Sequence, residues 1–119
     1  LDFRNIFAAG DATALSVPKL GHIAVIQADI AAKTIASDLG KKVEIPAFDP
    51  AILCVMERSN MQATMIYSNV LYGGKIDKTI NGPITYLMKW SFDFYYNFTR
   101  GHLPPNFAEK ILVKYFLKN

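Results

Sequence analysis

The chain has 119 residues, of which 51% are hydrophobic, 19% charged and 13% aromatic. This is about the length of one domain, enough for a modest core. The formal net charge of +3 is small, and the basic residues are not massed in one arm, which disfavours nucleic acid as a partner. No run approaches the roughly 18 to 20 uninterrupted apolar residues of a spanning helix. A mildly basic balance better suits an anionic membrane surface.

The first predicted element is a short buried strand at residues 6–9, closed by Gly10. A carboxylate just past it, Asp11, can project from the carboxyl edge of a sheet and accept hydrogen bonds from ligand hydroxyls. Aspartate also commonly turns a chain or caps a loop, so both interpretations stay open. Because the chain enters this strand almost at once and without a methionine, we expect it to be part of a larger protein.

Pro18 and Gly21 then indicate a loop, and residues 22–39 are predicted to form a helix that ends at Gly40. Isoleucines provide the large apolar side chains of this helix. Five alanines leave much of its surface with small side chains: Ala24, Ala28, Ala31, Ala32 and Ala36. Such a helix can lie very close to another backbone or to a flat ligand.

The middle of the chain predicts an antiparallel hairpin, with strands at residues 51–57 and 61–69, and a further strand near residues 70–72. The hairpin carries the only cysteine, Cys54, between Leu53 and Val55. A lone cysteine on a predicted strand is commonly a small buried hydrophobe.

Residues 84–100 predict a helix with a narrow polar stripe at spacings of three and four. The stripe consists of Lys89, Asp93, Asn97 and Arg100. The remaining surface is apolar and aromatic, so the helix has two faces to bury. A dimer or domain interface is one way to bury them.

A second terminal helix is predicted after a capping-box-like start at Asn106 and Glu109. Lys110, Lys114 and Lys118 recur every four residues beside an aromatic and aliphatic side. This pattern suits a helix that lies in the membrane interface. An ordinary core helix would also carry such an outer lysine row.

Four segments together carry a family resemblance: "NIFAAGDA", "PKLG" before "HIAVIQADIAAKTIASDLG", "AILCVMERSN", and "YLMKWSFDFYYNFTRGHLP". In this order and spacing, the chain resembles the carboxyl-terminal third of flavin-dependent sulfide:quinone oxidoreductases. These belong to the two-dinucleotide-domain flavoproteins, with type-two NADH dehydrogenases. The Gly-rich flavin loop and the upstream cysteines of the family are absent, so we expect the isolated chain to be inactive.

The resemblance implies flavin contacts near the start of the chain. It assigns Asp11 to the ribityl chain of FAD, with Gly10 allowing close backbone approach. Pro18, Lys19 and Gly21 belong to the loop and helix start at the pyrimidine end of the flavin ring. Independently of the resemblance, a helix amino terminus favours the anionic charge of a reduced flavin. Lys19 would add a positive charge, although most lysines in loops are simply solvated.

The resemblance also implies a sulfide site and a quinone site. Cys54 would be the catalytic cysteine, paired with an upstream cysteine as a redox disulfide. Leu53 would touch the quinone ring, Phe92 would stack on it, and Lys89 would offer a proton or hydrogen bond to a quinone oxygen. No metal is implied.

These observations predict an α+β fragment. Residues 1–45 would end an FAD-binding α/β domain with a strand and an Ala-rich helix, residues 46–82 would form a β-hairpin segment with Cys54, and residues 83–119 two amphipathic helices. The expected function is electron transfer from sulfide through FAD to quinone, in a peripheral protein on the cytoplasmic membrane. Expected partners are the remainder of the flavoprotein, sulfide, quinone, the membrane surface and a second copy in a homo-oligomer. The alternatives are part of a type-two NADH:quinone oxidoreductase, or a non-catalytic membrane-binding or dimerisation module.

Overall fold

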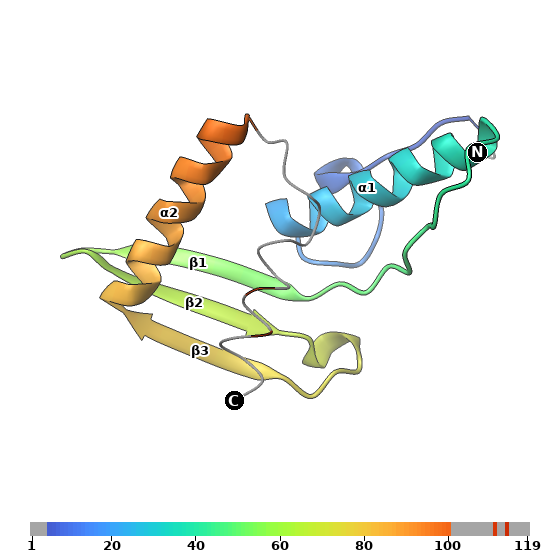
Figure 1. Ribbon diagram of the computed structural model, residues 1–119. Coiled ribbons are helices and arrows are strands. Elements are labelled where there is room, and N and C mark those ends of the chain that lie inside the picture. The colour runs from blue at the N-terminus through green and yellow to red at the C-terminus, as the bar shows by residue number, and fades with distance from the viewer. Residues whose placement is uncertain (1–4, 101–110, 112–113, 115–119) are drawn as a thin grey trace. The chain divides into compact units, whose positions relative to one another are not determined.

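A computed structural model describes residues 5–100 together with residues 111 and 114 (Figure 1). The chain divides into two compact units, Leu1–Pro50 and Ala51–Asn119, and each is described by itself. The described residues form a small α+β fold with one three-stranded antiparallel sheet and two α-helices.

The first unit is built around helix α1, Gly21–Asp38, which confirms the helix predicted at residues 22–39. Gly40 follows with a φ of +79°. Its N–H donates to the carbonyl oxygen of Ser37 at 2.8 Å, and the Lys41 N–H donates to that of Ala36 at 2.9 Å. These bonds satisfy carbonyl groups that the helix end leaves without partners, so the glycine ends the helix as predicted.

The strand predicted at residues 6–9 was wrong, because no strand within residues 5–100 pairs with it. Ala9 does have extended backbone angles, with φ −140° and ψ 158°. However, Ile6 is 70% exposed, and a short 3₁₀ helix, η1 (Gly10–Ala12), follows directly. An extended backbone is a local property, whereas a strand also needs a hydrogen-bonded neighbour.

The second unit contains the sheet, in the order β1 (Ile52–Arg58), β2 (Gln62–Ser68) and β3 (Asp77–Gly82). The first two strands confirm the predicted hairpin, with Leu53 opposite Tyr67 and Cys54 opposite Ile66. The turn between them holds Asn60 and Met61 with positive φ angles. The tight turn therefore brings the two predicted strands into direct register.

The further strand predicted near residues 70–72 was also wrong, since η2, Val70–Tyr72, is a 3₁₀ turn. Asn69 organises this turn: its carbonyl oxygen accepts from the Tyr72 N–H at 3.0 Å, and its Oδ1 accepts from the Ile76 N–H at 2.9 Å. The third strand is instead β3, which pairs Ile80 with Met65 of β2.

Alternation along the strands divides the sheet into two faces. One face carries the core of this unit, in which Ala51, Met65 and Tyr67 are buried. Helix α2, Pro83–Thr99, lies against the strands (Figure 1). Its Met88 packs against this core. Thr85 in its first turn is fully buried. The helix therefore packs on the sheet through its amino-terminal half.

From Trp90 onward α2 is largely exposed, and its large exposed side chains include Trp90, Phe94 and Phe98. Their rings stack in sequence, with centroids 6.0 Å and 6.4 Å apart. The helix predicted after Asn106 lies outside the described residues except for Ile111 and Lys114, which are exposed. Among the helices of the described part, none is long and apolar enough to cross a membrane.

Candidate functional site

The first unit brings four of the predicted flavin-contact residues together. A shallow depression beside the start of α1 is lined by Gly10, Asp11, Val17, Pro18, Lys19, Leu20, Ile23, Ala24 and Gln27. The fifth predicted residue, Gly21, is the first residue of α1 itself. Residues eight positions apart in the sequence, Gly10 and Pro18, thus line one small surface.

Hydrogen bonds close the loop around this depression. The Gly10 carbonyl oxygen accepts from the Thr13 N–H at 3.1 Å and from the Thr13 Oγ1 at 2.9 Å. Lys19 Nζ donates to the Thr13 carbonyl oxygen at 2.7 Å. The Gly10 N–H donates to Gln27 Oε1 on α1 at 2.6 Å. The loop is consequently tied both to itself and to the helix.

The polar groups at this depression suit the sugar-alcohol chain and pyrimidine end of a flavin. Asp11 is exposed and offers carboxylate oxygens as acceptors. Lys19 has three N–H donors, of which one reaches Thr13. Leu20 precedes α1 and makes no side-chain cap, and the first N–H groups of a helix have no partners within the helix. Donors and acceptors of these kinds are the ones that ribityl hydroxyls and a pyrimidine edge engage.

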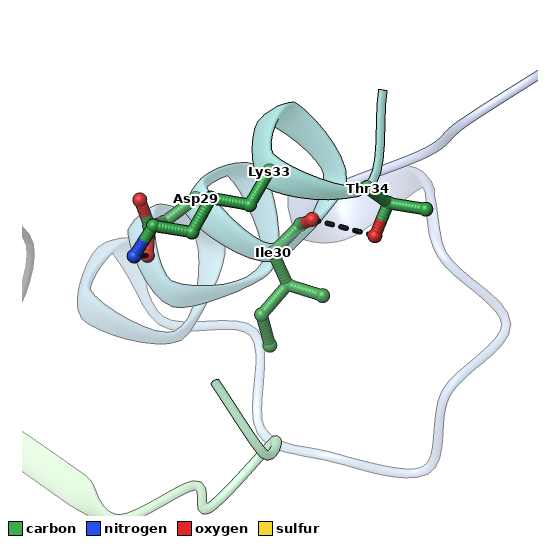
Figure 2. A network of polar contacts seen from close by, with 4 residues as sticks. All are labelled: Asp29, Ile30, Lys33 and Thr34. Atoms are coloured by element: carbon green, nitrogen blue, oxygen red, sulfur yellow. Dashed lines mark hydrogen bonds and ion pairs between the residues drawn. The ribbon is translucent and has the colours of Figure 1, made fainter. Parts of the chain in front are cut away.

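Figure 2 shows polar contacts farther along α1, which stabilise the helix itself. Lys33 pairs with Asp29 at 2.8 Å, one turn apart. The Thr34 hydroxyl donates to the carbonyl oxygen of Ile30, also at 2.8 Å. None of these four residues lines the depression, so they provide control positions for tests of the site.

In the second unit, the predicted quinone residue Lys89 forms a charge cluster with Glu57 and Asp93. Lys89 Nζ lies 2.8 Å from Glu57 Oε1 on β1 and 3.5 Å from Asp93 Oδ2 on α2. The hydrogen bond to Glu57 is the largest cause that raises the pKa of Lys89 above 10.5. Partial burial opposes this shift and the charge of Asp93 adds to it. Lys89 is therefore a protonated hydrogen-bond donor at neutral pH.

This shift predicts a pH-dependent coupling between Lys89 and Glu57. The pKa of Lys89 is raised in the folded state, so the protonated side chain stabilises the fold. This stabilisation is fully present below pH 10.5 and is lost as the pH rises through the raised pKa. A double-mutant cycle with Lys89→Met and Glu57→Gln should give a coupling below about 1 kcal/mol at neutral pH. Urea denaturation should show that this coupling vanishes in more alkaline solution. A coupling that persists there would contradict the assignment.

The two other predicted residues of β1 lie on opposite faces of the sheet. Leu53 packs against the core, on the face that α2 covers. Cys54 is half-buried and, being the next residue, points to the other face, where its cross-strand neighbours are Ile66 and then Thr79. The structure thus groups Leu53 with the α2 face and separates Cys54 from it.

The predicted quinone-stacking residue, Phe92, is exposed on α2 next to another ring. Phe92 is 44% exposed, and its ring lies 6.2 Å from that of Tyr96 at an angle of 32°. Lys89 precedes Phe92 by three residues, so both belong to one side of the helix. An aromatic ring beside an ammonium group can hold a flat, polar-edged ligand.

Sequence reasoning missed two residues of these sites, Gln27 and Glu57. Gln27 is only 8% exposed and lies one helical turn from the buried Ile23. A polar residue on the isoleucine face of the helix was the signal that could have revealed it. Glu57 had no comparable signal, because an acidic residue at a strand end is ordinary.

No family model matches the chain, and no solved structure matches it. The function is therefore argued from the geometry above together with the sequence resemblance.

Proposed function

We propose that this chain is the carboxyl-terminal part of a membrane-surface flavoprotein that passes electrons from sulfide to quinone. The observation that carries the proposal is the gathering of Gly10, Asp11, Pro18 and Lys19 around one depression at the start of α1. The resemblance assigns these same residues to the cofactor. FAD, when bound, would supply the two-electron exchange between donor and acceptor.

The first unit would hold the ribityl chain and the pyrimidine end of the cofactor. The Asp11 carboxylate accepts hydrogen bonds from ribityl hydroxyls, and these bonds are strong because the acceptor is charged. Lys19 and the first N–H groups of α1 provide positive charge and donors toward the pyrimidine end. Because Thr13 and Gln27 hold the loop in place, these groups are pre-organised for binding.

The second unit would supply the donor and acceptor sites. Cys54 would form a redox disulfide with a cysteine from the remainder of the flavoprotein. Sulfide would attack this disulfide, so that one cysteine sulfur becomes a persulfide and the other leaves as a thiolate, which carries the electron pair onward. On the other face, Leu53 and Phe92 contact the quinone ring. Lys89 offers its third N–H to a quinone oxygen, since Glu57 and Asp93 engage the other two.

The exposed aromatic residues of α2 support attachment to a membrane surface. Trp90 and Phe94 expose more than half of their surface, and Tyr96 about half. The amphipathic rings of Trp and Tyr are favoured at the boundary between lipid and water, and Phe suits the apolar side of that boundary. The predicted lysine row at Lys110, Lys114 and Lys118 would reach anionic head groups. We therefore propose that the whole protein attaches peripherally to the cytoplasmic membrane.

Riboflavin titration of the chain, followed by NMR, tests the flavin assignment. Riboflavin carries the flavin ring and the ribityl chain but no phosphate. A change in the charge of a protein side chain therefore alters riboflavin binding through hydrogen bonds and not through attraction to a phosphate. We expect weak binding that shifts the amide signals of the loop at residues 10–20. Asp11→Asn should reduce this binding about tenfold, because hydrogen bonds to a charged group contribute roughly 1.5 to 3 kcal/mol.

The matched control is Asp29→Asn, which makes the same charge change on α1 outside the depression. It should leave riboflavin binding unchanged. Absence of loop shifts in the unmodified chain, or equal losses in the two variants, would contradict the flavin assignment. A chain that binds vesicles but not riboflavin would indicate the membrane-binding module instead.

A further inference from the structure

Gln27 is a buried polar residue of α1. Its side chain contacts Gly10, at the start of the loop that borders the depression. Its exposed fraction is 8%, and its Oε1 accepts a hydrogen bond from the Gly10 N–H at 2.6 Å. Burial of an amide is costly unless the amide is hydrogen-bonded. The bond to Gly10 offsets that cost and joins residues 17 positions apart in the chain.

Gly10 is held by α1 at a second point as well. Its φ is +73°, and a Cβ atom at this position would lie 3.3 Å from the Cβ of Ala24. On its other side, the Gly10 carbonyl oxygen accepts both hydrogen bonds of Thr13. The peptide groups before and after Gly10 are consequently both restrained, and the direction in which Asp11 leaves the helix surface is set by them.

We propose that Gln27 is the positioning residue that holds the Gly10–Asp11 turn in the orientation in which Asp11 receives the ribityl hydroxyls. The inference rests on the proposed function. Gln27 acts through Gly10: its amide oxygen holds the N–H of the Ala9–Gly10 peptide, at the start of the turn from which Asp11 projects. Loss of the acceptor releases this peptide, so that Asp11 must be ordered again each time a ligand binds.

Two variants of the 119-residue chain separate this role from simple packing. Gln27→Met keeps the length and helix propensity of the side chain but removes the acceptor. Gln27→Glu keeps an acceptor oxygen. Amide hydrogen exchange measured by NMR reports the Gly10 hydrogen bond directly, and riboflavin titration reports the Asp11 site.

We expect Gln27→Met to accelerate exchange of the Gly10 N–H at least tenfold and to weaken riboflavin binding at least fivefold. Gln27→Glu should retain most of the Gly10 protection and bind riboflavin within threefold of the unmodified chain. The control Thr34→Val removes another side-chain hydrogen bond of α1 and should change neither quantity. Amide protection within α1 verifies that each variant is folded.

Unchanged Gly10 exchange in Gln27→Met would overturn the positioning role whatever happens to the ligand. Riboflavin binding that is equal in Gln27→Met and the unmodified chain would overturn it as well. If the unmodified chain shows no riboflavin shifts, the proposed function fails, and the role of Gln27 toward a ligand fails with it. Loss of Gly10 N–H protection and of riboflavin binding in Gln27→Met, with both retained in Gln27→Glu, supports the inference.

Discussion

If the proposed function holds, replacing Cys54 by serine in the whole protein is expected to abolish sulfide-dependent quinone reduction while FAD remains bound. We expect a loss of at least about 1,000-fold, because removal of a catalytic nucleophile typically costs more than that. A hydroxyl is far less acidic than a thiol and cannot supply a comparable nucleophile at neutral pH. Steady-state turnover with a water-soluble quinone measures the loss of activity. The flavin absorbance of the purified protein measures whether FAD remains bound.

The fold supplies a matched control for this substitution. Ile66 lies opposite Cys54 on β2 and belongs to the same face of the sheet. Ile66→Val changes packing beside the thiol without touching its chemistry, and typically costs about 0.5 to 1.5 kcal/mol of stability. It should leave turnover close to that of the unmodified protein. Near-normal turnover in Cys54→Ser would instead identify Cys54 as a packing residue.

Gly10→Ala should lower the free energy of unfolding by about 2 to 4 kcal/mol. An alanine at a φ of +73° is strained by roughly 1 kcal/mol or more. Its Cβ would also lie 3.3 Å from the Cβ of Ala24, and such crowding typically costs a further 1 to 3 kcal/mol. Urea denaturation followed by circular dichroism measures the loss.

Gly40→Ala separates these two causes. Gly40 has a similar φ of +79°, but nothing lies within 4 Å of a Cβ at that position. Gly40→Ala should therefore lower the free energy of unfolding by only about 1 kcal/mol, which is the backbone strain alone. The difference in unfolding free energy between the two variants measures the cost of crowding between a Cβ at position 10 and Ala24 of α1. Equal losses would show that α1 shifts to accommodate the new methyl group.

The amino-acid sequence by itself determined the elements that local patterns specify. α1 could be predicted because isoleucines recur with helical spacing and Gly40 provides the left-handed residue at its end. The hairpin could be predicted because two β-rich runs flank a short turn at residues 59–61. Four of the five residues that the resemblance assigns to a flavin line the same surface, but this grouping reflects a resemblance and not a local pattern.

Only the tertiary structure decided which extended segments become strands. Residues 6–9 look more like a strand than β3 does, because β3 contains Asp77, Lys78, Asn81 and Gly82, all poor strand formers. β3 nevertheless forms, since Asn69 folds the preceding turn and Ile80 reaches the core opposite Met65. Strand pairing depends on a partner that is distant in the sequence, so local propensity cannot specify it.

The contacts that define the two sites were likewise decided by the tertiary structure. Gln27 meets Gly10 across 17 residues, and Glu57 meets Lys89 across 32. Neither pair follows from helical or strand periodicity, which relates only neighbours within one element. Periodicity does place Leu53 and Cys54 on opposite faces, but only the packing of α2 determines that the face of Leu53 is the covered one. Elements follow from local spacing, whereas sites require the long-range packing that brings separate elements together.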